Sequence, residues 1–173
     1  MKLLLLLTPK DFRDESIATI KLFLDKWNVP YEIATYGLKD CVGSHGATYK
    51  PTVDANKALV SDYDGIVIID GEGIEGFRMY EYRPLLDLLM KFNANNKIIG
   101  AIGNSQKVLA RANIINGKKI AIFNDEETKR LVLLFHGIPS ENDFELSGNI
   151  LTVKDSALIQ QAIQGILSQL GVF

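Results

Sequence analysis

The turn Gly103-Asn104-Ser105 follows an apolar run of strand length and precedes a helical pattern. In many α/β enzymes a sharp strand-to-helix turn of this kind carries the catalytic nucleophile. Nucleophilic catalysis needs a thiol, hydroxyl or amine that a neighbouring base activates, and Gly103 has no side chain. Ser105 has a hydroxyl, but it lies two positions past Gly103, where a serine usually caps a helix or occupies its first turn. We therefore expect Ser105 to have a structural role.

A glycine at position 103 suits the same turn without reactive chemistry. The central residue of such an elbow adopts a backbone conformation that a Cβ atom disfavours, whereas glycine reaches positive φ without a steric penalty. We therefore predict φ > 0 at Gly103, directly after a strand that ends at Ile102, with a helix starting within two residues. The alternative is an ordinary loop glycine.

Arg13 lies among Asp11, Asp14 and Glu15, and two interpretations are open. In the first, Arg13 points into a cleft beside the N-terminus of the elbow helix, where a cation and free N–H groups would bind a small anion. In the second, Arg13 pairs with neighbouring carboxylates at a solvated helix start, where acidic residues are favoured by the helix dipole.

The chain contains one cysteine and two histidines. Cys41 follows the second expected strand, away from the elbow, so we expect an unreactive and partly buried thiol. His45, within Gly-Ser-His-Gly, could be structural or lie at an oligomer contact. His136 could line a pocket or be an ordinary loop histidine. No spacing such as His-Glu-x-x-His is present, so we expect no metal site and no cofactor.

Length and composition favour a single globular domain that spans residues 1–173, of which 47% are apolar and 23% charged. A net charge of −2 without a basic run argues against binding of nucleic acid or of anionic membranes. The run Leu3–Leu7 is too short for a signal peptide, and no run approaches the ~18 apolar residues of a membrane span. A single cysteine fits the reducing cytoplasm.

Strand and helix patterns alternate along the chain. Strands are expected at 2–8, 31–36, within 62–73, at 97–102 and 118–123, with a hairpin at 144–153; helices are expected at 13–27, 84–92, 105–113 and from Asp155 to Gly171, while 128–135 is ambiguous. Continuous apolar strands that alternate with helices predict a parallel sheet covered on both faces. Ligands of such sheets bind at the carboxyl ends of the strands, which here selects the loops 8–14, 70–75 and 103–105.

Five segments carry a resemblance to a known family. They are LLLLLTPKDFRDES (3–16), GSHGATYKP (43–51), DYDGIVIIDGEG (62–73), IIGAIGNSQKVLARANIINGKK (98–119) and HGIPSENDFELSGNILT (136–152). In this order they resemble the ThiJ/PfpI family, of the class I glutamine amidotransferase-like fold, and the second segment resembles its PfpI peptidase-like branch. The resemblance implies an α/β fold: a three-layer α/β/α sandwich with a flavodoxin-like, doubly wound, mostly parallel sheet and a strand-turn-helix elbow at Gly103. It also implies a homodimer or a larger homo-oligomer.

The resemblance places the functional positions of the family at Arg13, Gly103, Asn104 and His136. In the family, an elbow cysteine thiolate attacks carbonyl compounds, a glutamate of the first loop hydrogen-bonds the sulfur, and in many members a histidine beside the cysteine completes the site. The corresponding residues in this chain are Gly103, Arg13 and Asn104. His136 is the one side chain with catalytic potential that the resemblance keeps.

These substitutions predict a protein of this fold without its cysteine chemistry, because two catalytic partners are replaced together. Such a protein would bind a small anionic ligand in the cleft or act as an oligomeric scaffold. The alternative is a hydrolase-type enzyme (peptidase, glyoxalase-like or deglycase-like) that uses other groups in the same cleft. The candidate ligand-binding residues are Arg13, Gly71, Asn104, Ser105 and His136.

Overall fold

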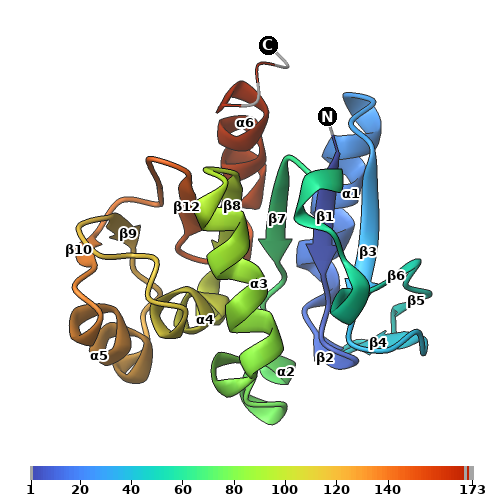
Figure 1. Cartoon of the computed structure of the whole chain (residues 1–173), viewed down its shortest axis with the longest axis horizontal. Helices are drawn as coiled ribbons and strands as arrows, with labels where there is room; N and C mark the ends of the chain where they lie inside the picture. Colours follow the sequence, from blue (N-terminus) through green and yellow to red (C-terminus); the bar gives the residue numbers. More distant parts are fainter. Residues whose placement is uncertain (1, 170, 172–173) are drawn as a thin grey trace.

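The computed structural model describes residues 2–169 and 171 and has a seven-stranded central sheet in the order β11-β12-β8-β7-β1-β3-β6 (Figure 1). Every neighbouring pair is parallel except β11 with β12. Its strands are β1 (Leu3–Leu6), β3 (Tyr31–Thr35), β6 (Val53–Asp54), β7 (Gly65–Ile68), β8 (Ile98–Ile102), β11 (Phe144–Ser147) and β12 (Ile150–Val153). The sub-order β3-β1-β7-β8-β12 is that of a flavodoxin-like, doubly wound sheet.

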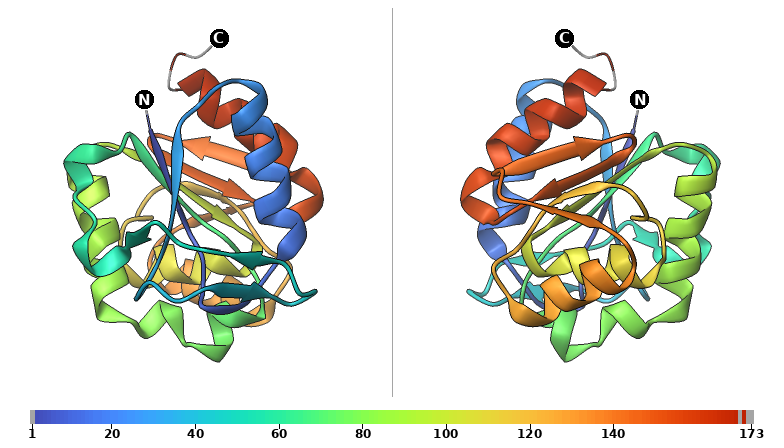
Figure 2. Two further views of the ribbon diagram at one scale, coloured as in Figure 1. Left: turned by 90° about the vertical axis from the view of Figure 1, so that its right-hand side faces the viewer. Right: turned by 90° about the vertical axis from the view of Figure 1, so that its left-hand side faces the viewer.

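Helices cover both faces of the sheet, as Figure 2 shows most clearly in its left view. The helices are α1 (Asp14–Lys26), α2 (Glu72–Gly76), α3 (Arg83–Ala94), α4 (Gln106–Arg111), α5 (Glu126–Leu134) and α6 (Ile159–Gln169). In β1, Leu3 and Leu5 pack in the core under α1 and α6, whereas Leu4 and Leu6 pack in the core under α3 and α4. Burial on both faces is why this strand is apolar at every position. The predicted three-layer α/β/α sandwich is therefore confirmed.

The remaining elements are short strands and 3₁₀ turns outside the central sheet. They are the three-stranded sheet of β2 (Lys10–Phe12), β4 (Cys41–Gly43) and β5 (Thr48–Tyr49), the parallel pair β9 (Lys119–Ala121) and β10 (Ile138–Ser140), and the 3₁₀ turns η1 (Ala55–Lys57), η2 (Val60–Asp62), η3 (Met79–Glu81), η4 (Gly103–Ser105) and η5 (Ser156–Leu158). The ambiguous segment 128–135 lies mostly in α5, which begins after Asp125 because the Asp125 carboxylate accepts the N–H of Thr128 (3.0 Å). Within the described part of the chain, no helix has the length and apolar character needed to cross a membrane.

Two buried side chains at the start of α4 fix the elbow helix in the fold. The amide of Gln106 donates to the carbonyl oxygens of Ala121 (2.7 Å) and Val153 (3.0 Å), which ties α4 to the ends of β9 and β12. The ammonium of Lys107, whose side chain is 6% exposed, lies 3.0 Å from a carboxylate oxygen of Glu75 and 3.3 Å from one of Glu127. The elbow is therefore held from the sheet and from both neighbouring helices.

Candidate functional site

The candidate site lies at the carboxyl ends of β1, β7 and β8, where the order of the strands reverses between β1 and β7. Open α/β sheets bind their ligands at such a point, because the loops of the two neighbouring strands diverge to opposite faces there. The three loops selected from the sequence lie at this edge.

Gly103 forms the predicted elbow. Its φ is +51°, it follows directly on the last residue of β8, and it begins the 3₁₀ turn that leads into α4 at Gln106. The predicted positive φ is confirmed, whereas the helical segment that begins within two residues is only the 3₁₀ turn, and the α-helix itself begins three positions after Gly103. A Cβ atom at this position would lie 3.3 Å from Oδ2 of Asp70 and 3.6 Å from the ring of Phe123. The space beside the elbow is thus bounded by a carboxylate and an aromatic ring.

Asn104 and Ser105 use their polar atoms within the fold. The Asn104 side chain donates to the carbonyl oxygen of Gly71 (2.7 Å) and accepts the N–H of the same residue (3.2 Å). The Ser105 hydroxyl is buried, accepts the N–H of Ile102 (2.8 Å) and lies 3.0 Å from the carbonyl oxygen of Ile68. The Ser105 hydroxyl therefore bonds to the backbone at the ends of β7 and β8, and the Asn104 side chain joins two loops of the candidate site.

Gly71 makes this junction possible through its backbone conformation. Its φ of +139° and ψ of 175° lie in a region that is essentially restricted to glycine. A Cβ atom there would lie 2.5 Å from the carbonyl oxygen of Asp11 and 2.7 Å from the nitrogen of Arg13. The end of β2 and the loop after β7 therefore approach each other more closely than any residue other than glycine at position 71 would allow.

Asp70 belongs to the candidate site, although the sequence analysis did not select it. Its side chain is 6% exposed, Oδ1 accepts a hydrogen bond from the Ser16 hydroxyl (2.6 Å), and Oδ2 lies 3.3 Å from Nε of Arg13. Burial raises the pKa of Asp70 to about 6, although the Ser16 hydrogen bond and the Arg13 charge both lower it. An acidic residue that ends an otherwise apolar strand at the topological switch point was the signal that could have identified it.

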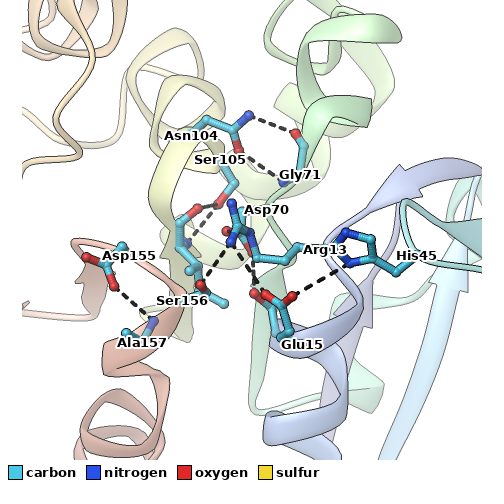
Figure 3. Close-up of polar contacts among 12 residues, drawn as sticks. Arg13, Glu15, His45, Asp70, Gly71, Asn104, Ser105, Asp155, Ser156 and Ala157 are labelled. Atoms are coloured by element: carbon cyan, nitrogen blue, oxygen red, sulfur yellow. Dashed lines mark hydrogen bonds and ion pairs between the residues drawn. The ribbon is translucent and has the colours of Figure 1, made fainter. Parts of the chain in front are cut away.

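Arg13 pairs with carboxylates, as the second interpretation of the sequence predicted. Its guanidinium contacts Asp70 as above, Oε2 of Glu15 at 3.5 Å and the hydroxyl of Ser156 at 3.2 Å (Figure 3). The main partner, however, is the buried Asp70 and not one of the adjacent acids. In place of an added anion, the chain supplies its own carboxylate to Arg13.

A hollow of about 140 Å³ opens beside this ion pair, lined by Arg13, Glu15, Ser44, His45, Gly71 and Glu72. The Asp14 carboxylate accepts the backbone N–H groups of His45 (3.1 Å) and Ala47 (3.0 Å), which holds the β4–β5 turn at the start of α1. Nδ1 of His45 lies 3.7 Å from a carboxylate oxygen of Glu15. His45, treated above as structural or as an oligomer contact, thus lies in the wall of the site.

His136 is not brought to the elbow. It is exposed, and its carbonyl oxygen accepts the N–H of Gly117, ahead of the first residue of β9. The elbow residue Gln106 bonds instead to Ala121, the last residue of β9. The two positions therefore lie at opposite ends of that strand, and His136 is not among the residues that line the hollow beside Arg13.

Cys41 lies in β4 and is fully buried, not partly buried as expected. Burial raises the pKa of its thiol, which disfavours the reactive thiolate. Among the residues that the structure describes, no three His, Cys, Asp or Glu side chains are grouped so as to hold a metal ion.

The strand order and the left-handed elbow define the class of the protein, a flavodoxin-like α/β fold with its site at the switch point. The model of the DJ-1/PfpI family matches residues 1–159, and the chain belongs to this family. An uncharacterized protein of Methanocaldococcus jannaschii is 30% identical over 156 residues, covering 88% of this chain and 74% of the relative.

Solved structures show the same fold. A ThiJ/PfpI domain protein from Brachyspira murdochii superposes with a TM-score of 0.92 at 16% identity, covering 99% of this chain and 97% of the other. A two-domain protein from Anabaena variabilis, with DJ-1/ThiJ/PfpI-like and ferritin-like domains, superposes with a TM-score of 0.90 at 16% identity, covering 99% of this chain and 50% of the other.

We predict that Gly103→Cys folds but lowers the free energy of unfolding by roughly 1 kcal/mol or more, because a side chain at positive φ is strained. Its Cβ would also lie close to the Asp70 carboxylate. Urea denaturation measures the change. Gly117→Ala is the matched control, since Gly117 also has positive φ but open space around its Cβ position. A Gly103→Cys variant as stable as the parent would contradict the prediction.

We also predict a pH-dependent stability difference between the parent and Asp70→Asn. The raised pKa of Asp70 means that the folded protein holds this proton more tightly than the unfolded chain, whose Asp has its usual pKa of 3.8. Stability due to this group is therefore fully present below about pH 4 and is lost as pH rises through about 6, by on the order of 3 kcal/mol.

The measurement is urea denaturation of both proteins at about pH 4 and at about pH 7.5. Asp70→Asn removes the ionisable group, so the variant should gain stability relative to the parent between the two pH values. A constant difference would show that burial of Asp70 does not raise its pKa.

Proposed function

We propose that this DJ-1/PfpI protein binds a small ligand at the elbow and does not carry out nucleophilic catalysis. The observation that carries the proposal is the composition of the elbow: Gly103 has no side chain, and the Ser105 hydroxyl is engaged with the backbone of β7 and β8. Nucleophilic catalysis needs an accessible and activated thiol, hydroxyl or amine. Cys41 is buried in β4, and its pKa is raised.

The ligand that we propose is a small anion. Support comes from Arg13, whose side chain is 46% exposed and lines the hollow together with Ser44 and His45. Guanidinium groups bind carboxylates and phosphates through charge-assisted hydrogen bonds. A volume of about 140 Å³ is below the range typical of drug-sized ligands, so the hollow suits a single small group.

A hydrolase-type reaction is the second candidate function, and Asp70 is the observation that favours it. A carboxyl with a pKa of about 6 can exchange protons near neutral pH, which general acid–base catalysis requires. In this alternative, Asp70 would activate a water molecule beside Gly103, and no covalent intermediate would form.

Assays of peptide hydrolysis, ester hydrolysis and methylglyoxal consumption distinguish the two functions. For the ligand-binding function we expect no turnover by the parent above the uncatalysed rate, and none by Cys41→Ser. Turnover that Asp70→Asn abolishes while Cys41→Ser retains it would establish the alternative. Turnover that is lost in Cys41→Ser would overturn both, because it would require thiol chemistry outside the elbow.

We also propose that the protein forms a homo-oligomer. Members of the DJ-1/PfpI family are often oligomeric, and closed two-fold dimers are the commonest assembly of soluble chains. Light scattering at micromolar concentration should therefore give at least twice the mass of one chain. The mass of a single chain at that concentration would exclude the oligomer.

A further inference from the structure

Arg13 lies at the boundary between a buried carboxylate and an open hollow. Its Nε is 3.3 Å from Oδ2 of Asp70, and the same side chain lines the hollow with Ser44, His45 and Gly71. Figure 3 shows the guanidinium beside Asp70 with dashed lines to Glu15 and Ser156, and a further dashed line joins Glu15 to His45. The Arg13 guanidinium therefore contacts the buried Asp70 carboxylate and also lines a hollow that is open to solvent.

Of the two carboxylates that contact Arg13, that of Asp70 interacts with the guanidinium more strongly. Its side chain is 6% exposed, whereas that of Glu15 is 59% exposed and is screened by water. The interaction with Asp70 acts in a less polar medium, so it determines how much positive potential Arg13 presents to the hollow. An anion that enters the hollow must compete mainly with Asp70.

Few other charges face this pair. Glu15 approaches from α1 and contacts His45 of the β4–β5 turn, and Glu72 lines the hollow from α2. The groups closest to Asp70 from the elbow side are Gly103 and the ring of Phe123, which carry no charge. Among the described residues that contact Arg13, Asp70 is the buried carboxylate, so its protonation removes a counter-charge that water does not screen.

We propose that Arg13 binds a small oxyanion in this hollow when Asp70 is protonated, and that ionised Asp70 excludes the oxyanion. The inference rests on the proposed anion-binding function and adds its regulation: the site opens as pH falls. Binding is coupled to uptake of one proton by Asp70, because the incoming anion replaces the carboxylate charge beside Arg13. The hydrogen bond from Ser16 and the backbone bond from Arg13 N–H to Asp70 O (2.8 Å) hold the loop in place while this happens.

Sulfate is a suitable probe because it keeps its double negative charge throughout the mildly acidic and neutral range. Binding is followed by NMR titration of the Arg13 Nε–H signal and of the backbone amides of His45 and Gly71, at constant ionic strength set with chloride. With a pKa of about 6, Asp70 is mostly protonated at about pH 5 and only a few per cent protonated at about pH 7.5. The parent should therefore bind sulfate at least about tenfold more tightly at the lower pH.

Variants distinguish the control of binding by Asp70 from the binding of the anion by Arg13. Asp70→Asn should bind sulfate with similar affinity at both pH values, and Arg13→Gln should not show saturable binding at either. His45→Asn should keep the pH dependence of the parent, which excludes the imidazole that lines the hollow as the source of that dependence. Arg83→Gln, which removes an exposed arginine paired with Asp87, is the control for loss of surface charge.

The outcomes are distinct. Saturable binding that needs Arg13 but does not change with pH, or that loses its pH dependence in His45→Asn, would overturn the control of binding by Asp70. It would not contradict the anion site itself. No saturable binding by Asp70→Asn at either pH would overturn the anion site itself. If Arg13→Gln does not fold, the shifts of the His45 and Gly71 amides in Asp70→Asn still locate the sulfate, and shifts confined to other residues count against the site.

Discussion

The carboxylate of Asp70 is buried where the strand order of the sheet reverses, and the surrounding loops are arranged around its contacts. Its side chain binds Ser16 and Arg13 at the start of α1, and its backbone oxygen accepts the Arg13 N–H. Arg13 in turn reaches Ser156 ahead of α6. A buried charge is tolerated only when it is paired and hydrogen-bonded, so the geometry of these segments follows from the need to satisfy one carboxylate.

Close approach of the loops is the second constraint, and two glycines permit it. Gly71 has no Cβ to collide with the turn after β2, and the Asn104 side chain bonds to both of its backbone polar groups. Gly103 adopts the left-handed conformation of the elbow without a side chain that would contact Asp70. The strand-turn-helix elbow is therefore kept by backbone geometry and hydrogen bonding, and a reactive side chain is not needed to maintain it.

Our proposal of ligand binding without covalent chemistry rests on these features. The Ser105 hydroxyl is bonded to backbone groups, whereas Arg13 is paired with Asp70 and could exchange this anionic partner for another. The hollow beside Arg13 is small and carries both signs of charge. An anionic ligand there would replace the charge of Asp70 beside Arg13. Burial raises the pKa of Asp70 and so disfavours its ionised form.

The amino-acid sequence by itself determined the layers of this protein, the parallel sheet and the elbow. Apolar runs that continue through β1, β7 and β8 can be satisfied only by burial on both faces, and a glycine directly after β8 indicated a left-handed turn that the structure has. The family was also evident from the order of its motifs.

Tertiary structure decided which side chains meet. Strands of two or three residues, such as β2, β5 and β6, carry too little pattern to be predicted. The small sheet of β2, β4 and β5 nevertheless brings the turn that holds His45 to the start of α1. Asp70 and Arg13 are far apart in the sequence, and His136 is separated from the elbow by the length of β9. The partner of a charged residue depends on distances between loops, and these distances are set by packing of the whole sheet, which no local pattern of residues records.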